Sequence, residues 1–333
     1  MQIYQIDAFA KELFQGNPAA VVPLQEWLPD DLMQRIAMEN NLADTAFFIP
    51  EGDGFAIRWF TPATEIALCG HATLASGHVL FEHLGYKGDL IRFRSLNSGF
   101  LEVSRDSAVS GSPANTPTTG APTGATTPAS STPTSIPALL TLNFPAGAPQ
   151  PVDPAPLSAI FEALGIPPHP LFKGPFDYMV VLDNPGAITA LQPDFKLLAT
   201  VPARGIVVTA PGTASSPTAP EPISTINPVS GANPSPAPNP ASSSTLSPRP
   251  TPSSAPPDFV SRCFFPQSGI DEDPVTGSAH TMLVPYWAAR LGKQRLTAIQ
   301  LSARRGYLDC RLDGDRVYIS GYAKTFMKGE ILL

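Results

Sequence analysis

The sequence predicts a mixed α/β (α+β) protein made of two similar halves, each a central helix wrapped by a curved sheet. Two stretches carry this prediction. Residues 69–73 and 274–279 are turns of small residues, and each leads into an apolar stretch of helical length, at 74–84 and at 280–291. The first of these helices is apolar on nearly every side, which is typical of a buried helix. Two similar units in one chain indicate two halves with a site between them.

The first half reads as strands with one amphipathic helix. Residues 1–10 alternate between apolar and polar types, which indicates a β-strand. Gly16, Asn17 and Pro18 are expected to form a turn. Pro29 stands where the first turn of a helix tolerates proline, and apolar residues then recur at helical spacing up to residue 39. Further strands are expected at residues 19–24, 45–49, 55–60, 90–93 and 99–103.

The second half shows the same kinds of segments around the second small-residue turn. A short helix is expected at residues 156–164, and Asp313 and Gly314 give a strong hairpin signal. The final strand is expected to close one of the two sheets. Ordered sequence resumes at residues 139–144, and strands are predicted at residues 178–182, 205–209, 259–265, 296–302, 306–312, 316–322 and 329–333.

Two segments of low complexity interrupt this pattern. Residues 106–135 and 211–257 are rich in Ser, Thr, Ala, Gly and Pro, and they hold 19 of the 40 prolines. Such segments cannot bury enough apolar surface to offset the entropy of ordering them, so they are expected to be loops or tethers. The predicted organisation is a first half at 1–105, with the final strand 326–333 added to it. The second half then covers 136–325 and contains the insert 211–257.

Composition excludes several classes of function. The net charge of −7 and the absence of a Lys/Arg cluster argue against nucleic-acid binding. The three cysteines are far apart and show no metal-ligand spacing, so neither a structural metal site nor a disulfide framework is expected. The N-terminal segment has no basic region followed by an apolar run, and no segment approaches the length of a membrane span. We therefore expect a soluble, cytoplasmic protein without membrane partners.

Four polar residues stand where chemistry is expected. Asp44 lies among apolar residues at a helix-to-strand junction, where partial burial would raise the pKa of its carboxyl and suit it to acid/base catalysis. His71, Asp273 and Ser278 lie on or beside the two small-residue turns. The free backbone N–H groups at the start of a helix favour a bound anion such as a carboxylate. If the halves face each other, Asp273 is also placed to orient His71.

Simpler interpretations stand beside these. Each small-residue turn can be only a helix cap, and Asp44 can be only a turn residue. Ser278 and His71 together would suit acyl transfer. The sequence around Ser278 lacks the second glycine of the GxSxG motif, which argues against that reaction.

Four motifs resemble those of the phenazine-biosynthesis PhzF-like family. They occur in the family's order, and the match covers the chain outside the two inserts. The motifs are GNPAAVV at 16–22, NNLADTAFF at 40–48, FTPATEIALCGHATLASGHVL at 60–80 and GIDEDPVTGSAH at 269–280. The resemblance implies a diaminopimelate-epimerase-like fold of two pseudo-symmetric halves, each with a strongly curved, mostly antiparallel sheet. It also implies a homodimer, with the active site in the cleft between the halves.

The resemblance also assigns roles to residues. The family's general acid/base falls on Asp44, where the family pattern has Glu, and its other catalytic positions fall on His71 and Asp273. The substrate-binding positions implied by the motifs are Asn17, Gly70, Gly277 and Ser278. Related epimerases use two facing cysteines. Here Cys69 stands at the first place and Thr276 at the second, which argues against a two-cysteine racemase.

The expected activity is a cofactor-independent, metal-free isomerisation that moves a proton within a small carboxylate-bearing metabolite. The alternative is a family member whose chemistry is weakened by the shorter Asp44 side chain and which binds a metabolite or a protein partner. His71, Asp273 and Ser278 favour the first reading.

Overall fold

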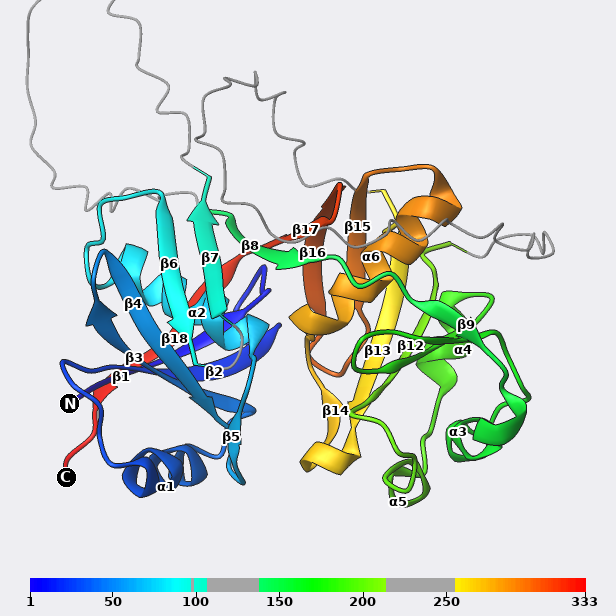
Figure 1. The fold of residues 1–333 in the computed structure, drawn as a ribbon, viewed down its shortest axis with the longest axis horizontal. Coiled ribbons are helices and arrows are strands. Elements are labelled where there is room, and N and C mark those ends of the chain that lie inside the picture. The colour runs from blue at the N-terminus through cyan, green and yellow to red at the C-terminus, as the bar shows by residue number, and fades with distance from the viewer. Residues whose placement is uncertain (97–98, 107–137, 214–254) are drawn as a thin grey trace, which may run out of the picture.

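The computed structural model describes residues 1–96, 99–106, 138–213 and 255–333. The chain forms two halves that lie side by side, each with one long helix packed against a curved sheet (Figure 1). Helix α2 occupies the centre of the first half and α6 that of the second. In the described part of the chain, none of the helices has the length and hydropathy of a membrane-crossing segment.

The first half is built from the strands and helices that the sequence indicates. Helix α1 has Pro29 before its first turn, Asp30 and Asp31 within it, and Asn41 in the left-handed conformation after its last turn. The elements are β1 (Gln2–Ala8), β2 (Asn17–Pro23), α1 (Asp30–Asn40), β3 (Asp44–Glu51), β4 (Gly54–Phe60), β5 (Glu65–Ile66), α2 (Gly70–Glu82), β6 (Leu90–Ser95), β7 (Gly99–Arg105) and β8 (Leu140–Pro145).

The second half contains several short helices in addition to its long one. Its helices are η1 (Ala155–Leu157), α3 (Ser158–Leu164), α4 (Pro185–Ala190), α5 (Phe195–Leu198), η2 (Pro266–Ser268) and α6 (Gly277–Leu291). Its strands are β9 (Gln150–Val152), β10 (Leu171–Lys173), β11 (Tyr178–Val181), β12 (Ile206–Pro211), β13 (Phe259–Phe265), β14 (Ile270–Asp273), β15 (Arg295–Gln300), β16 (Gly306–Asp313) and β17 (Arg316–Gly321), and β18 (Ala323–Glu330) follows.

The two halves repeat one succession of strand pairings. In the first half, β1–β2 is antiparallel, β2–β3 parallel, β3–β4 antiparallel and β4–β6 parallel, and β7 and β8 continue antiparallel. In the second half, the pairs β10–β11, β11–β12, β12–β13 and β13–β15 follow the same order of directions, and β16 and β17 continue antiparallel. Helix α2 precedes β6 as α6 precedes β15. The predicted repetition is therefore present in the topology.

Two connections join the halves. Strand β8 pairs with β7 of the first half and with β17 of the second, so the hydrogen-bonded sheet runs through both. After β17 the chain crosses back, and β18 pairs with β1 along its length. The last strand thus pairs with the first half, and it begins at Ala323. The strand predicted at 329–333 is wrong by several residues. In the described chain β1 is the only ladder partner of β18, and β18 stops at Glu330 because its partner there, Gln2, is the first residue of β1.

The core explains why both long helices lack a polar face. Nearly every side chain of α2 is buried, and α6 is buried along most of its length. A Cβ atom added to Gly77 would lie 2.6 Å from the side chain of Val103, so glycine at this position lets α2 approach strand β7 closely. Apolar side chains of both halves form one continuous cluster around the two helices. Smaller clusters lie under α1 and around α3 to α5.

Three predicted turns have a different structure. Asn17 and Pro18 already belong to β2, where they pair with β1. Residues 70–73 form the first turn of α2, and residues 277–279 form the first turn of α6. Small residues carry little local information about where a helix begins, so the sequence placed both starts too late.

The two low-complexity segments leave and re-enter the fold between neighbouring strands. The amide of Asp106 donates to the carbonyl of Leu139, and that of Gly212 donates to the carbonyl of Asp258. These bonds continue the antiparallel pairs β7–β8 and β12–β13. The prediction that the inserts are loops or tethers otherwise concerns residues 107–137 and 214–254, which lie outside the described part.

Candidate active site

The first turns of α2 and α6 meet at the seam between the halves. A Cβ atom added to Gly70 would lie 3.4 Å from the Cα of Gly277, and one added to Gly277 would lie 3.5 Å from the Cα of Gly70. Each half therefore contributes a helix start with no side chain between the two backbones. The residues before them, Cys69 and Thr276, are extended and make no side-chain cap bond. Uncapped first turns leave N–H groups that suit an anion.

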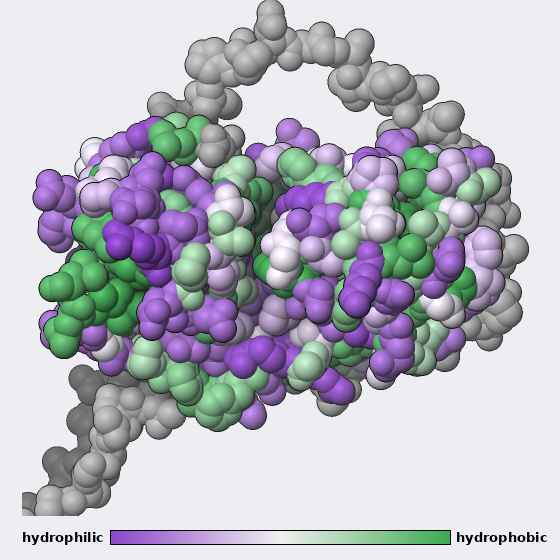
Figure 2. All heavy atoms as spheres, turned by 90° about the horizontal axis from the view of Figure 1, so that it is seen from below, coloured by the Kyte–Doolittle hydropathy of each residue, from purple (hydrophilic) through white to green (hydrophobic). Residues whose placement is uncertain are grey.

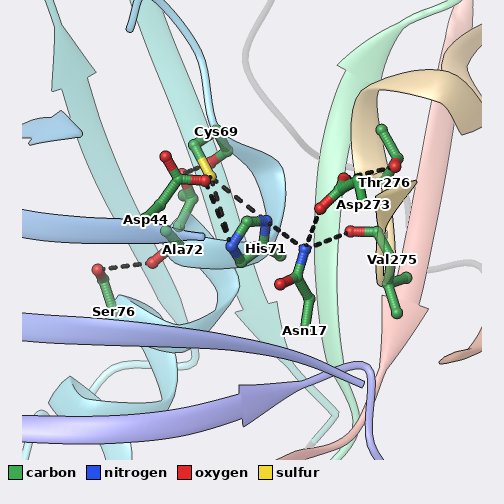
Figure 3. A network of polar contacts seen from close by, with 10 residues as sticks. Asn17, Asp44, Cys69, His71, Ala72, Ser76, Asp273, Val275 and Thr276 are labelled. Atoms are coloured by element: carbon green, nitrogen blue, oxygen red, sulfur yellow. Dashed lines mark hydrogen bonds and ion pairs between the residues drawn. The ribbon is translucent and has the colours of Figure 1, made fainter. Parts of the chain in front are cut away.

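Asp44 is the first residue of β3 and lies beside the start of α2 (Figure 3). Its Oδ2 accepts a hydrogen bond from the Cys69 thiol over 3.2 Å and lies 3.4 Å from Nε2 of His71. Its Oδ1 is buried and has no partner in the described structure. Burial raises the pKa of the Asp44 carboxyl well above its usual range, the Cys69 hydrogen bond opposes this rise, and the charge of Asp273 adds to it. Such a carboxyl is suited to both accepting and returning a proton near neutral pH.

The neighbours of Asp44 are neutral. Burial raises the pKa of the Cys69 thiol, and the negative charge of Asp44 raises it further, so the sulfur keeps its proton. Burial lowers the pKa of His71 to about 3, so the imidazole is uncharged at neutral pH. The cluster around Asp44 therefore supplies hydrogen-bond donors rather than a positive charge.

Asn17 fixes the state of His71. Its amide nitrogen lies 3.1 Å from Nδ1 of His71, 2.7 Å from Oδ1 of Asp273 and 2.9 Å from the carbonyl of Val275. The reverse orientation would turn the amide oxygen toward a carboxylate and a carbonyl. The amide has two hydrogens for these three acceptors, so one hydrogen is shared. Because an amide nitrogen only donates, this arrangement favours Nδ1 of His71 as an acceptor, with the ring proton on Nε2, facing Asp44.

Asp273 ends β14 and faces the same seam from the second half. Its Oδ2 accepts from the Thr276 hydroxyl over 2.5 Å, and Gln300 bonds both the backbone of Asp273 and the amide of Thr276. Burial raises the pKa of Asp273 to about 6, although the hydrogen bonds from Thr276 and Asn17 work against this rise. Asp273 does not contact His71 directly: the Asn17 amide lies between them.

Three of these groups also lie at distances that suit a metal ion. One ligand atom each of Asp44, Cys69 and His71 falls within 4.8 Å of the others. A metal-bound histidine usually donates its other ring N–H to an acceptor, whereas Nδ1 of His71 faces a donor, the Asn17 amide. This second contact argues against metal ligation through Nε2 of His71. The expectation of no metal stays a prediction.

Ser278 leads to two residues that the sequence did not single out. Its hydroxyl accepts a hydrogen bond from Nη2 of Arg204 over 3.1 Å. Arg204 in turn makes a double hydrogen bond to the buried carboxylate of Asp177. Neither residue belongs to a recognisable motif. The available signal was weak: an arginine directly before Gly205, at the start of an expected strand.

The site is closed in this structure. Asp44, His71 and Asp273 are 4%, 5% and 8% exposed. Seen from below, the halves appear as two lobes with a furrow between them (Figure 2). The predicted catalytic residues from both halves are thus gathered at one buried seam, with Asn17 joining them. The predicted binding residues Gly70 and Gly277 touch across it, and Ser278 lies toward Arg204.

Three buried ionisable groups thus lie at the seam of two similar halves, and the comparisons give the family to which this arrangement belongs. The PhzC-PhzF family model, described as phenazine biosynthesis-like protein, matches residues 6–329. The chain therefore belongs to this family, which confirms the resemblance found in the four motifs. An uncharacterized isomerase of Pseudomonas aeruginosa is 39% identical over 333 residues, covering 100% of this chain and 99% of that protein.

Solved structures agree with this assignment. The crystal structure of a PhzF-family phenazine biosynthesis protein from Enterococcus faecalis superposes with a TM-score of 0.74 at 35% identity, covering 100% of this chain and 99% of the other. A probable proline racemase from Agrobacterium radiobacter gives a TM-score of 0.56 at 9% identity, covering 100% and 93%. At that identity the likeness concerns the fold alone. The predicted fold class is confirmed.

Proposed function

We propose that the protein is a cofactor-independent isomerase that moves a proton within a small carboxylate-bearing substrate at the seam between the halves. The observation that carries this proposal is the surroundings of Asp44. A carboxyl with a raised pKa accepts a hydrogen bond from the Cys69 thiol and faces Nε2 of His71, directly beside two uncapped helix starts. These are the parts that proton abstraction next to a carboxylate requires.

The proposed reaction has two proton transfers. The substrate carboxylate lies on the free N–H groups near Gly70 and Gly277. Ionised Asp44 removes a proton from a neighbouring carbon, and the electron pair of the broken C–H bond moves into the substrate toward its carboxylate. The helix N-termini stabilise the charge that develops there. Neutral Asp44 then returns the proton to another carbon of the same conjugated system, so that no atom or electron is gained or lost.

His71 and Asp273 have supporting roles in this proposal. Nε2 of His71 faces Asp44 over 3.4 Å, and a proton on this nitrogen would favour the carboxylate form of Asp44. Asp273 holds Asn17, which fixes the tautomer of His71, and its own raised pKa makes it the second group able to exchange a proton. Because these groups are covered, substrate entry requires the two halves to part. The β8 and β17–β18 connections would serve as the hinges.

The test is incorporation of solvent deuterium. The protein is incubated in D₂O with a pool of small cellular carboxylates, and mass spectrometry identifies the compounds that gain one mass unit. Native protein should label at least one compound. Asp44→Asn, which keeps the size of the side chain, should abolish labelling while the thermal midpoint stays within a few degrees.

Asp44→Glu is the matched comparison, because the resemblance places Glu at this position. Glu extends the carboxyl by roughly 1 Å, and a misplacement of that size costs on the order of 100-fold in rate. Faster labelling by Asp44→Glu would mean that the native side chain is too short. Slower labelling would mean that the site has adapted to Asp. Full labelling by Asp44→Asn would exclude Asp44 as the acid/base. Binding of a compound without any exchange would instead identify a metabolite-binding protein.

A further inference from the structure

Arg204 lies at the edge of the site and takes no part in the proposed proton transfer. It precedes β12 and reaches the first turn of α6, where its Nη2 donates to Ser278. Its positive charge also acts on Asp273 and lowers that carboxyl's pKa against the larger effect of burial. The guanidinium therefore lies against the first turn of α6 and acts electrostatically on Asp273.

Two hydrogen bonds to a buried carboxylate and two aromatic rings hold the guanidinium in one position. Nε donates to Oδ1 of Asp177 over 2.8 Å, and Nη2 donates to Oδ2 over 2.5 Å. The side chain of Asp177 is only 3% exposed, so it cannot follow the arginine elsewhere. The rings of Phe176 and Phe265 lie 5.0 Å and 5.5 Å from the guanidinium carbon. The guanidinium is therefore preorganised to bind an anion, because a carboxylate fixes one of its edges and aromatic rings surround it.

The remaining edge of the guanidinium is unused. Among the described residues, Nη1 of Arg204 donates no hydrogen bond, and 34% of the side chain is exposed. Arg262 provides the contrast. It likewise makes two hydrogen bonds to a carboxylate, that of Glu272. Its Nη1, however, donates to the carbonyls of Ile188 and Leu191, and its side chain is only 13% exposed. Arg262 is a completed structural pair, whereas Arg204 keeps donors free beside the site.

We infer that Arg204 binds a second acidic group of the substrate, so that the substrate class is a small dicarboxylate. This inference rests on the proposed function, which places the first carboxylate at the two helix starts. A guanidinium presents parallel N–H groups that match a carboxylate, and such charge-assisted bonds are about twice as strong as neutral ones. Phe176, a residue that is 52% exposed, offers an apolar wall for the carbon chain between the two acids.

The test compares dicarboxylate probes with monocarboxylate probes. Malonate, succinate, glutarate and adipate, and separately propionate, butyrate, valerate and hexanoate, are titrated into the native protein by isothermal calorimetry. At least one dicarboxylate should bind about tenfold or more tightly than the monocarboxylate of matching length, as expected for a charged hydrogen-bonded pair. Arg204→Gln should reduce this preference to about twofold or less and leave monocarboxylate binding unchanged.

Two further variants separate binding from folding. Arg204→Gln leaves the buried carboxylate of Asp177 without its partner, so the double variant Asp177→Asn/Arg204→Gln removes both charges and should show the same loss. Arg94→Gln removes an arginine that pairs with Glu51 and should keep the full preference.

Equal binding of the two probe classes by the native protein would overturn the inference, as would a preference that survives in both Arg204 variants. Neither result concerns deuterium exchange by Asp44, so failure of this inference is distinguishable from failure of the proposed function.

Discussion

The thiol of Cys69 donates a hydrogen bond to Oδ2 of Asp44 across 3.2 Å, although Asp44 begins β3 and Cys69 precedes α2. The bond favours the ionised carboxylate, whereas burial favours the neutral acid. Burial has the larger effect, so the pKa is raised. Cys69 thus limits how far the pKa of the proposed acid/base can rise.

Replacing Cys69 should shift the pH profile of deuterium exchange. Proton abstraction requires ionised Asp44, so the rate should fall as pH drops through the pKa of that carboxyl. Cys69→Ala removes a bond that lowers the pKa, and the acidic limb should move to higher pH. Cys69→Ser keeps a donor and should move it much less. Cys310→Ala, at another buried cysteine, serves as the control and should leave the limb in place. An unmoved limb in Cys69→Ala would show that the thiol does not tune Asp44.

Buried His280 should make the fold sensitive to acid. Its Nδ1 bonds the carbonyl of Thr276, and burial lowers its pKa from 6.5 to about 4. Between these values the unfolded chain binds a proton that the folded chain does not, so the free energy of unfolding falls as pH drops through this window. The loss should reach about 3 kcal/mol. Urea titrations should show that the free energy of unfolding falls less with decreasing pH in His280→Gln than in the native protein, by about 3 kcal/mol. The difference between the two proteins at about pH 8, which reflects packing alone, is subtracted first. An identical decline would contradict a neutral buried His280.

Arg304 should stabilise the fold far more than a surface arginine does. It pairs with the buried carboxylate of Asp7 and donates to the carbonyls of Gln15 and Gly16, just before Asn17. Arg304→Met leaves the buried Asp7 carboxylate without its charged partner and should lower the free energy of unfolding by roughly 2 kcal/mol or more. Deuterium exchange should also slow, because Asn17 loses its support.

The matched control for Arg304 is Arg35→Met. Arg35 and its partner Asp31 are 67% and 73% exposed, and such a helix-surface pair contributes about 0.5 kcal/mol or less. Similar losses in the two variants, measured by urea unfolding, would contradict a special role for Arg304.

The two low-complexity segments should be dispensable for folding. The strand ends that they connect are already hydrogen-bonded neighbours. Replacing residues 107–135 and 212–255 with short Gly/Ser linkers shortens both loops, and loop closure changes by only about 0.6 kcal/mol per doubling of length. The thermal midpoint should therefore stay the same or rise slightly in calorimetry. A clear drop, or loss of folded protein, would show that an insert packs on the fold.

Much of the fold could be predicted from local patterns. The strand expected at 259–265 matches β13, and α1, β4 and β16 fall within a few residues of their predicted places. Apolar alternation and helical spacing reflect contacts that each element makes with its own sheet or core. The start of α2 and of α6 could not be placed, because Cys69 and Thr276 provide no side-chain cap and small residues fit both a turn and a helix.

The sequence by itself determined the two repeated units and named Asp44, His71 and Asp273 as chemical candidates. Only the tertiary structure decided that Asn17 lies between His71 and Asp273, a contact spanning 256 residues of chain. It alone joined Arg204 to Asp177 and Ser278. These arrangements depend on how the two halves dock and how loops meet across a sheet. Because local residue preferences act only over one or two turns of chain, they contain no information about contacts of that separation.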